Sequence, residues 1–137
     1  MAAISRTVDA LRLFGDDLIP AEISSLLGSE PTAYSTKGGV RSPSPGKDVV
    51  AKTGSWRLRV EDRSPGDLDG QIRELLSQLT SDLFVWQDLS RRYRCDIFCG
   101  LFMEKGNEGD ELQPDTMVMI GTRELCLGFD IYDSTPD

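Results

Sequence analysis

The sequence has 137 residues, of which 39% are hydrophobic and 28% are charged, as expected of one globular domain that buries a core without disulfides. No apolar run approaches the roughly 20 residues that a membrane span needs, and the first residues lack the basic and apolar segments of a secretion signal. The net charge of −8 disfavours nucleic acid as the main partner, and an odd number of cysteines in apolar segments indicates a reducing cytoplasm.

The first predicted elements are a strand over residues 7–14 and a helix over residues 20–27. Apolar residues recur near a period of two in the strand, which indicates one buried face. Pro20 suits the first position of a helix, and Gly28 suits the position just past its end. Because the apolar side chains between them recur at helical spacing, we expect this helix to pack on a sheet.

The middle of the chain is predicted to hold an extended segment over 31–37, a flexible loop over 38–50 and a strand over 53–60. Glycine and proline are frequent in the loop, which argues against regular structure there. The strand alternates apolar residues, including Trp56, with polar ones. Its apolar face, and Trp56 with it, is expected in the core.

Two helical pieces are predicted to follow. Apolar residues from Leu68 to Leu79 keep helical spacing, and the pattern resumes up to Leu89. Residues 80–82 are Thr-Ser-Asp, a weak helical segment with capping residues, so a break is expected there. The remaining predicted elements are a central strand over 93–103, a loop over 105–111, a helix over 114–121, a strand over 125–132 and an acidic tail over 133–137.

This order of elements, β-α-β-β-α-β-α-β, defines the predicted fold. Its first six elements match the split β-α-β core of ferredoxin-like folds, with one helix and one strand appended. We therefore predict a single α+β domain over residues 1–137. Its sheet is expected to be mainly antiparallel, with the helices on one face.

Five segments of the chain, in order, are LRLFGDDLIPAEISSLLG, PTAYSTKGG, TGSWRL, RCDIFCGLF and LCLGFDIYD. Together they resemble the bacterial domain-of-unknown-function family 4279 over nearly the whole chain. The resemblance implies membership of a domain family and implies no activity. After RCDIFCGLF the family pattern has Gly-Gly-Phe and a Ser-Pro helix start, whereas this chain has GNEGDELQP, so we carry over no role for this loop.

Histidine is absent, so the commonest general base and metal ligand are both missing. Catalysis would then need carboxylates, and the candidates are Asp16 and Asp17 after the first strand and Asp96 and Asp130 on later strands. A structural alternative is that Asp16 or Asp17 closes its turn and favours the helix N-terminus. We assign no catalytic residue, no metal and no cofactor.

We expect these carboxylates to line a ligand-binding pocket. The predicted binding residues are Asp16, Asp17, Lys37, Trp56, Asp96, Cys99, Asp130 and Tyr132. Lys37 precedes two glycines that can cradle a phosphate, although the spacing of a P-loop is absent. Cys99 lies in an apolar strand, and without a histidine to activate it, buried packing is the simpler interpretation.

Basic residues are concentrated in the segment 37–59, which holds six of them and a single acid, Asp48. Two interpretations are open. The segment pairs with the acidic C-terminal half of the same chain, or it binds an anionic ligand on the sheet face around Trp56. The first is the simpler of the two.

Residues 61–137 carry seven basic and seventeen acidic side chains, a net charge of −10 that steers basic partners toward this half. The expected partner surface consists of Glu104, Glu108, Asp110, Glu111 and Asp115. We therefore predict a non-catalytic interaction module, such as an immunity-type protein that masks a basic toxin. The alternatives are a small-ligand-binding or carboxylate-dependent enzyme domain with an aspartate-lined pocket, and a homo-oligomer formed through an edge strand.

Overall fold

A computed structural model of the chain describes residues 2–133. The strands are β1 (Ala2–Ala3), β2 (Arg6–Gly15), β3 (Ala33–Ser35), β4 (Val40–Ser44), β5 (Lys47–Val50), β6 (Gly54–Arg59), β7 (Arg94–Phe102), β8 (Glu108–Gly109) and β9 (Cys126–Tyr132). The helices are α1 (Pro20–Leu27), α2 (Leu68–Ser77), α3 (Leu83–Arg92) and α4 (Pro114–Thr122). The predicted α+β class is confirmed.

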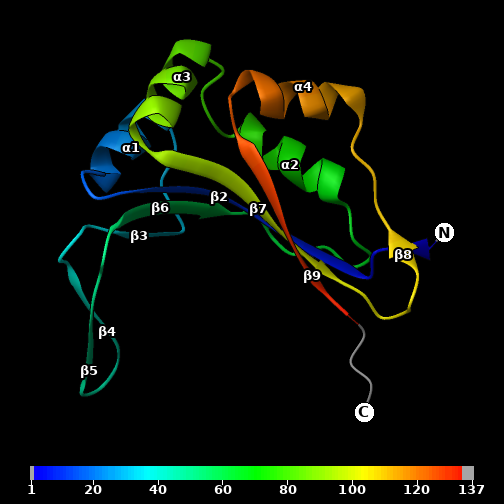
Figure 1. Ribbon diagram of the computed structural model, residues 1–137, viewed down its shortest axis with the longest axis horizontal. Coiled ribbons are helices and arrows are strands. Elements are labelled where there is room, and N and C mark those ends of the chain that lie inside the picture. Colours follow the sequence, from blue (N-terminus) through cyan, green and yellow to red (C-terminus); the bar gives the residue numbers. More distant parts are fainter. Residues whose placement is uncertain (1, 134–137) are drawn as a thin grey trace.

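The main sheet has five strands in the order β3-β6-β2-β7-β9. Every neighbouring pair is antiparallel except β7 and β9, which run parallel. All the helices of the described residues lie on one side of this sheet, and the other side is left open (Figure 1). The sheet is therefore mixed but mostly antiparallel, as predicted.

The alternation of side chains along β2 separates the two faces of the sheet. Leu11 and Leu13 are fully buried on the helix-covered face. Arg12 and Phe14 point to the opposite face, because successive side chains of a strand point to opposite sides. Buried leucines and isoleucines of α1, α2 and α3 complete the core on the covered side.

Local capping explains where the helices begin and end. Gly28 has a φ of 78° at the end of α1, a left-handed conformation that favours glycine. The side chain of Asp67 accepts a hydrogen bond from the Gly70 N–H at the start of α2. Asp82 accepts one from the Phe84 N–H at the start of α3, so the predicted break at residues 80–82 is confirmed.

The expectation that residues 38–50 lack regular structure is wrong, because this segment forms the hairpin β4–β5. Val40 pairs with Val50 and Arg41 with Val49, which are ladder contacts between residues too far apart for a local pattern to reveal. Gly46 has a φ of 78° in the turn, where a glycine is suited. The hairpin projects below the open face of the sheet, and its residues are exposed (Figure 1).

A two-stranded parallel pair, β1 with β8, was not predicted from the sequence. Strand β8 lies within the segment 105–111 that was expected to be a loop, β1 precedes the first predicted strand, and each has only two residues. Both Glu108 carboxylate oxygens accept from the Ser5 hydroxyl, and they also accept backbone N–H groups of residues 5, 104 and 105. These bonds tie the segment around Ser5 to the loop between β7 and α4. No helix in the described part of the chain is long and apolar enough to cross a membrane.

Candidate functional site

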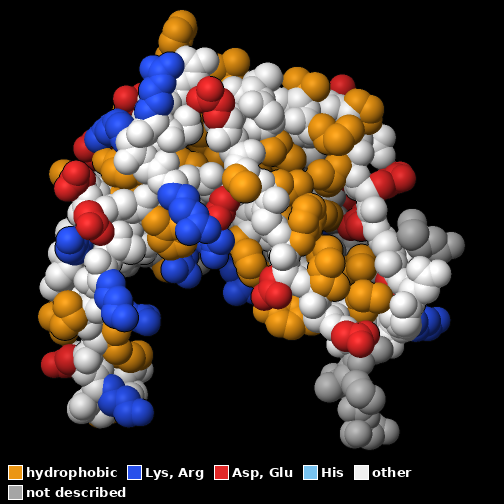
Figure 2. All heavy atoms as spheres, in the orientation of Figure 1, with side chains coloured by type: hydrophobic (Ala, Val, Ile, Leu, Met, Phe, Trp, Pro, Cys, Tyr) orange, Lys and Arg blue, Asp and Glu red, His pale blue; other side chains and the backbone are white. Residues whose placement is uncertain are grey.

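A pocket of about 390 Å³ lies between the β4–β5 hairpin and the open face of the sheet at the β3 and β6 edge. Its floor comes from Phe14, Ser35 and Ser55, and its outer wall comes from the hairpin. In Figure 2 the hairpin projects from the body of the protein, and blue basic side chains border the recess beside it. The pocket exists because the hairpin folds back beside the sheet rather than forming the predicted loop.

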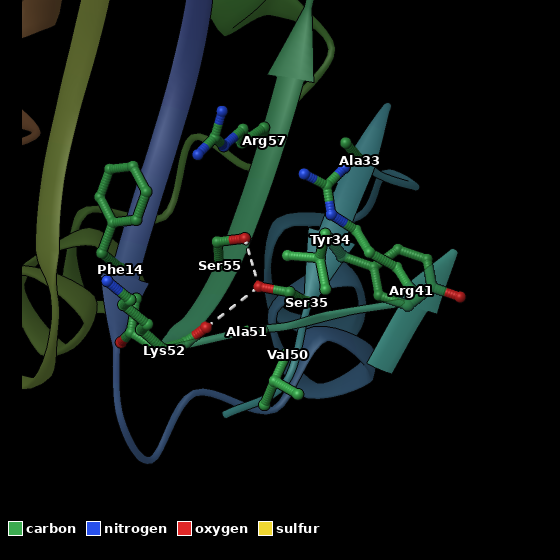
Figure 3. Close-up of a pocket in the computed structure, with 12 residues that line it drawn as sticks. Phe14, Ala33, Tyr34, Ser35, Arg41, Val50, Ala51, Lys52, Ser55 and Arg57 are labelled. Carbon is green, nitrogen blue, oxygen red and sulfur yellow. Dashed lines mark hydrogen bonds between the residues drawn. The ribbon is translucent and has the colours of Figure 1, made fainter. Parts of the chain in front are cut away.

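Three cations line this pocket: Arg41 from β4, Lys52 from the segment before β6, and Arg57 from β6. Figure 3 shows them placed around the two serines. The Arg57 guanidinium lies 5.3 Å from the centre of the Phe14 ring, a cation–π contact that holds it against the sheet. None of the three makes an ion pair with another described residue, so their positive charges are not neutralised.

The floor of the pocket is polar and hydrogen-bonded. The hydroxyl oxygens of Ser35 and Ser55 are 2.8 Å apart, and the Ser35 hydroxyl donates to the Thr53 carbonyl at 3.1 Å (Figure 3). A hydroxyl can rotate its proton toward a new acceptor, so these groups can redirect a hydrogen bond to a bound anion. No carboxylate is among the residues that line the pocket. Its chemistry therefore suits an anionic group.

Asp16 and Lys37, two predicted binding residues, pair with each other beside this pocket without lining it. The Lys37 ammonium donates to Asp16 at 3.0 Å, and this hydrogen bond lowers the pKa of the exposed Asp16 carboxyl. Arg59 pairs likewise with Asp62. Asp62 belongs to the acidic half of the chain and Asp16 does not, so within the described residues that half pairs with only one of the six basic side chains of segment 37–59.

The structure does not bring the predicted aspartates together. Asp17 lies in the turn after β2, and Asp96 lies on the open face of β7. Asp130 sits across from Gly100, four residues along β7 from Asp96, which separates them by about 13 Å at 3.3 Å per residue. Among the described residues, no group of acids or cysteines has the geometry to hold a metal ion.

Asp96 is instead the partner of Arg12 on the neighbouring strand. Its two carboxylate oxygens accept from the Arg12 guanidinium at 2.8 and 2.9 Å, and the Asp96 side chain is only 8% exposed. Arg12 also lies over the Phe98 ring, 4.6 Å from its centre. The pair cross-links β2 and β7.

We expect Asp96→Ala to lower the free energy of unfolding by about 1–3 kcal/mol, because it leaves a half-buried guanidinium without its acceptor. Urea unfolding followed by circular dichroism measures this loss. Asp130→Ala is the control, since among the described residues its carboxylate accepts only from the exposed Tyr132 hydroxyl. Equal stability of the two variants would contradict a structural role for Asp96.

Trp56 and Cys99 belong to the core. Trp56 is fully buried on the helix-covered face, and its indole N–H donates to the Ser24 hydroxyl at 3.0 Å. Cys99 is also fully buried, and burial raises the pKa of its thiol, which keeps it protonated. Tyr132 is 44% exposed and stacks on Phe102 at the far end of the sheet, with ring centres 4.5 Å apart. None of the three lines the pocket.

The predicted acidic partner surface divides into two groups. Glu108 and Asp110 make structural hydrogen bonds, since Glu108 binds the N-terminal segment and Asp110 accepts from the Leu68 N–H at the start of α2. Glu104, Glu111 and Asp115 are exposed. All five lie on or next to the loop between β7 and α4.

Asp9 is a buried acid that the sequence analysis did not single out. It is 1% exposed on the covered face of β2, opposite Cys99 of β7, and within the described residues its carboxylate has no donor beyond a weak interaction with that thiol. Burial raises the pKa of Asp9 to about 7. Its sequence position could have indicated its burial, because residues two apart on a strand share a face and Leu11 lies on the apolar face.

The pocket itself was only partly anticipated. The basic character of segment 37–59 pointed to Arg41, Lys52 and Arg57, but their meeting point depends on the hairpin. No sequence signal pointed to Ser35 and Ser55, because each is an ordinary polar residue on an alternating strand.

The fold and the pocket together define an α+β domain with a basic recess at one edge of its open sheet. The chain belongs to the family described as Domain of unknown function (DUF4279), whose model matches residues 6–134. This confirms the family resemblance seen in the sequence. Comparisons with curated proteins and with solved structures found no match.

Proposed function

We propose that this domain is a non-catalytic binding module that takes a small anionic molecule, bearing a phosphate or carboxylate group, in the pocket beneath the β4–β5 hairpin. The observation that carries the proposal is the placement of Arg41, Lys52 and Arg57 around one cavity without a neutralising acid. Hydrogen bonds from cationic donors to an anion are stronger than neutral ones. An anion in this pocket would relieve the repulsion among the three cations.

The size and lining of the pocket support a small molecule. Its volume of about 390 Å³ falls within the range of small-ligand pockets. Phe14 and Tyr34 add aromatic surface beside the cations, which suits a ligand with a flat or apolar part. The lining offers no carboxylate and the chain has no histidine, so binding rather than proton transfer is the function that these residues support.

The proposal is tested by thermal-shift screening of the purified chain against inorganic phosphate, nucleoside monophosphates, sugar phosphates and dicarboxylates, with calorimetry on the hits. We expect at least one of these anions to raise the melting temperature, because a ligand that binds only the folded state stabilises it. Arg57→Gln is expected to weaken binding about 10-fold or more, since a charge-assisted hydrogen bond contributes roughly 1.5–3 kcal/mol.

Lys47→Gln is the matched control, because Lys47 is a cation of the same hairpin that does not line the pocket. It removes the same charge and should leave the affinity within about twofold, apart from weak long-range effects that salt screens. Equal losses of affinity in the two variants would indicate nonspecific electrostatic attraction and would contradict binding in this pocket. Tight binding of single-stranded nucleic acid in place of the small anions would redirect the proposal to another class of ligand.

We also propose that the core follows the ferredoxin-like plan. The order β3-β6-β2-β7 supports it, because β6 lies between β2 and β3 while β2 lies between β6 and β7. The first β-α-β unit, β2-α1-β3, is thus split by β6, and the second, which runs from β6 through α2 and α3 to β7, is split by β2. Strand β9, reached through α4, is then the appended fifth strand.

A further inference from the structure

Strand β9 forms an open edge of the sheet. Within the described residues it pairs only with β7, so the backbone groups along its outer side have no ladder partner. An unpaired edge is a template for another strand, and natural proteins usually protect it with charges, proline or a covering element. Between Cys126 and Tyr132 the strand contains no proline or lysine, and its acid, Asp130, is the one charged residue.

An apolar groove of about 240 Å³ runs beside this edge on the helix-covered face. Helix α4 covers the start of β9 but not its end, so Phe129 is 52% exposed and Ile131 is 62% exposed. Leu101 and Met103 line the same groove. Figure 2 shows orange apolar side chains gathered over β9 and the neighbouring elements, on the side away from the hairpin.

The opposite wall of the groove is acidic. Glu108, Asp110 and Glu111 line it from the loop between β7 and α4. Among the described acids from Glu104 to Asp130, none makes an ion pair, so this charge is unneutralised. A negative wall facing an apolar strand favours a ligand that carries both apolar and cationic side chains.

We propose that the β9 edge binds a basic, amphipathic segment of a partner protein, which adds to the sheet as a sixth strand. Its apolar side chains would enter the groove against Phe129 and Ile131, since alternate residues of an added strand face the same side. Its lysines or arginines, at the intervening positions, would face the open side of the sheet, where Asp130 of β9 lies opposite Gly100 of β7. The backbone ladder supplies affinity, the groove selects apolar side chains, and the net negative charge of this half of the chain favours cationic ones.

The same charges disfavour a second copy of this chain as the occupant. Residues 61–137 carry a net charge of −10, so pairing two β9 edges would bring two acidic surfaces together. Like charges placed against each other at an interface are destabilising. A basic segment has the complementary charge instead.

The probe is a fluorescein-labelled peptide of about seven residues, the length of β9, with alternating valine and lysine. We expect saturable binding to the full chain by fluorescence anisotropy, and at least 10-fold weaker binding of a peptide with glutamate in place of lysine. A peptide of the same composition with its valines and lysines in two blocks should also bind at least 10-fold more weakly. Hydrogen exchange of amides in residues 126–132 should slow when the alternating peptide binds, which reports strand addition directly.

Ile131→Lys is expected to reduce binding at least 10-fold, because it places a cation in the apolar groove that receives the peptide. Ile131 is mostly exposed, so the variant should fold. Phe84→Lys is the matched control, since it makes the same change at an apolar residue of α3 that is 81% exposed and outside the groove. Unchanged binding to the Ile131 variant, or equal binding of the glutamate peptide, would overturn the proposal. Dimerisation of the wild-type chain that Ile131→Lys abolishes would also overturn it, by showing a second copy in the groove.

Discussion

Replacing Asp9 by asparagine is expected to stabilise the protein above pH 7, by about 2–4 kcal/mol. Within the described residues the buried Asp9 carboxylate has no donor beyond a weak interaction with the Cys99 thiol, and burial raises its pKa to about 7. Each pKa unit corresponds to about 1.4 kcal/mol of difference between the two protonation states. Asparagine keeps the shape of the side chain and cannot ionise, so it removes the cost of burying a charge.

The direction of the pH dependence follows from the same pKa. Between the ordinary aspartate value of 3.8 and about 7, the folded state holds a proton on Asp9 that the unfolded state has released. Stability contributed by this proton is fully present below pH 3.8 and is lost as the pH rises through about 7. The wild-type protein should therefore lose stability relative to Asp9→Asn across this window, and the difference should level off above it.

Urea unfolding of both proteins from pH 4 to pH 8.5 measures this difference. Asp17→Asn, at an exposed position of the turn after β2, is the matched control and should follow the wild type at every pH. If Asp9→Asn and the wild type showed a constant difference over the range, Asp9 would not be the group that takes up the proton.

The second large effect is expected from Trp56→Ala, which should cost about 3–5 kcal/mol of stability, as large-to-small substitutions of buried aromatic residues do. Trp56 is fully buried between β6 and the helices, and its indole donates to Ser24 on α1. The substitution leaves a cavity and leaves the serine without that donor. Denaturant unfolding at pH 7 measures the loss.

Two further variants separate packing from hydrogen bonding at this position. Trp56→Phe keeps most of the ring and loses the indole N–H, so it should cost less than the alanine variant. Phe84→Ala removes an aromatic ring that is 81% exposed and should change stability by less than about 0.5 kcal/mol. A Trp56→Ala protein as stable as the Phe84 variant would contradict the placement of Trp56 in the core.

Most of the elements were predictable because their signals are local. The bounds of α1 are those predicted from Pro20 and Gly28, and the break between α2 and α3 follows from the capping residue Asp82. Alternation predicted β6, β7 and β9 to within one or two residues, since a half-buried strand imposes a period of two on its own sequence. The hairpin was missed because its pairing joins residues across a turn in a segment rich in glycine and proline.

The sites depend on tertiary structure to a greater degree. Sequence alone established a histidine-free chain with a basic central segment and an acidic C-terminal half, and it pointed to the family through five ordered segments. It could not show which charges meet. The hairpin places Arg41 in the same pocket as Arg57. The strands separate Asp96 from Asp130, and Asp96 pairs with Arg12 instead. Composition and periodicity are properties of neighbouring residues, but a binding site is made by residues from separate strands, so only the folded chain decides it.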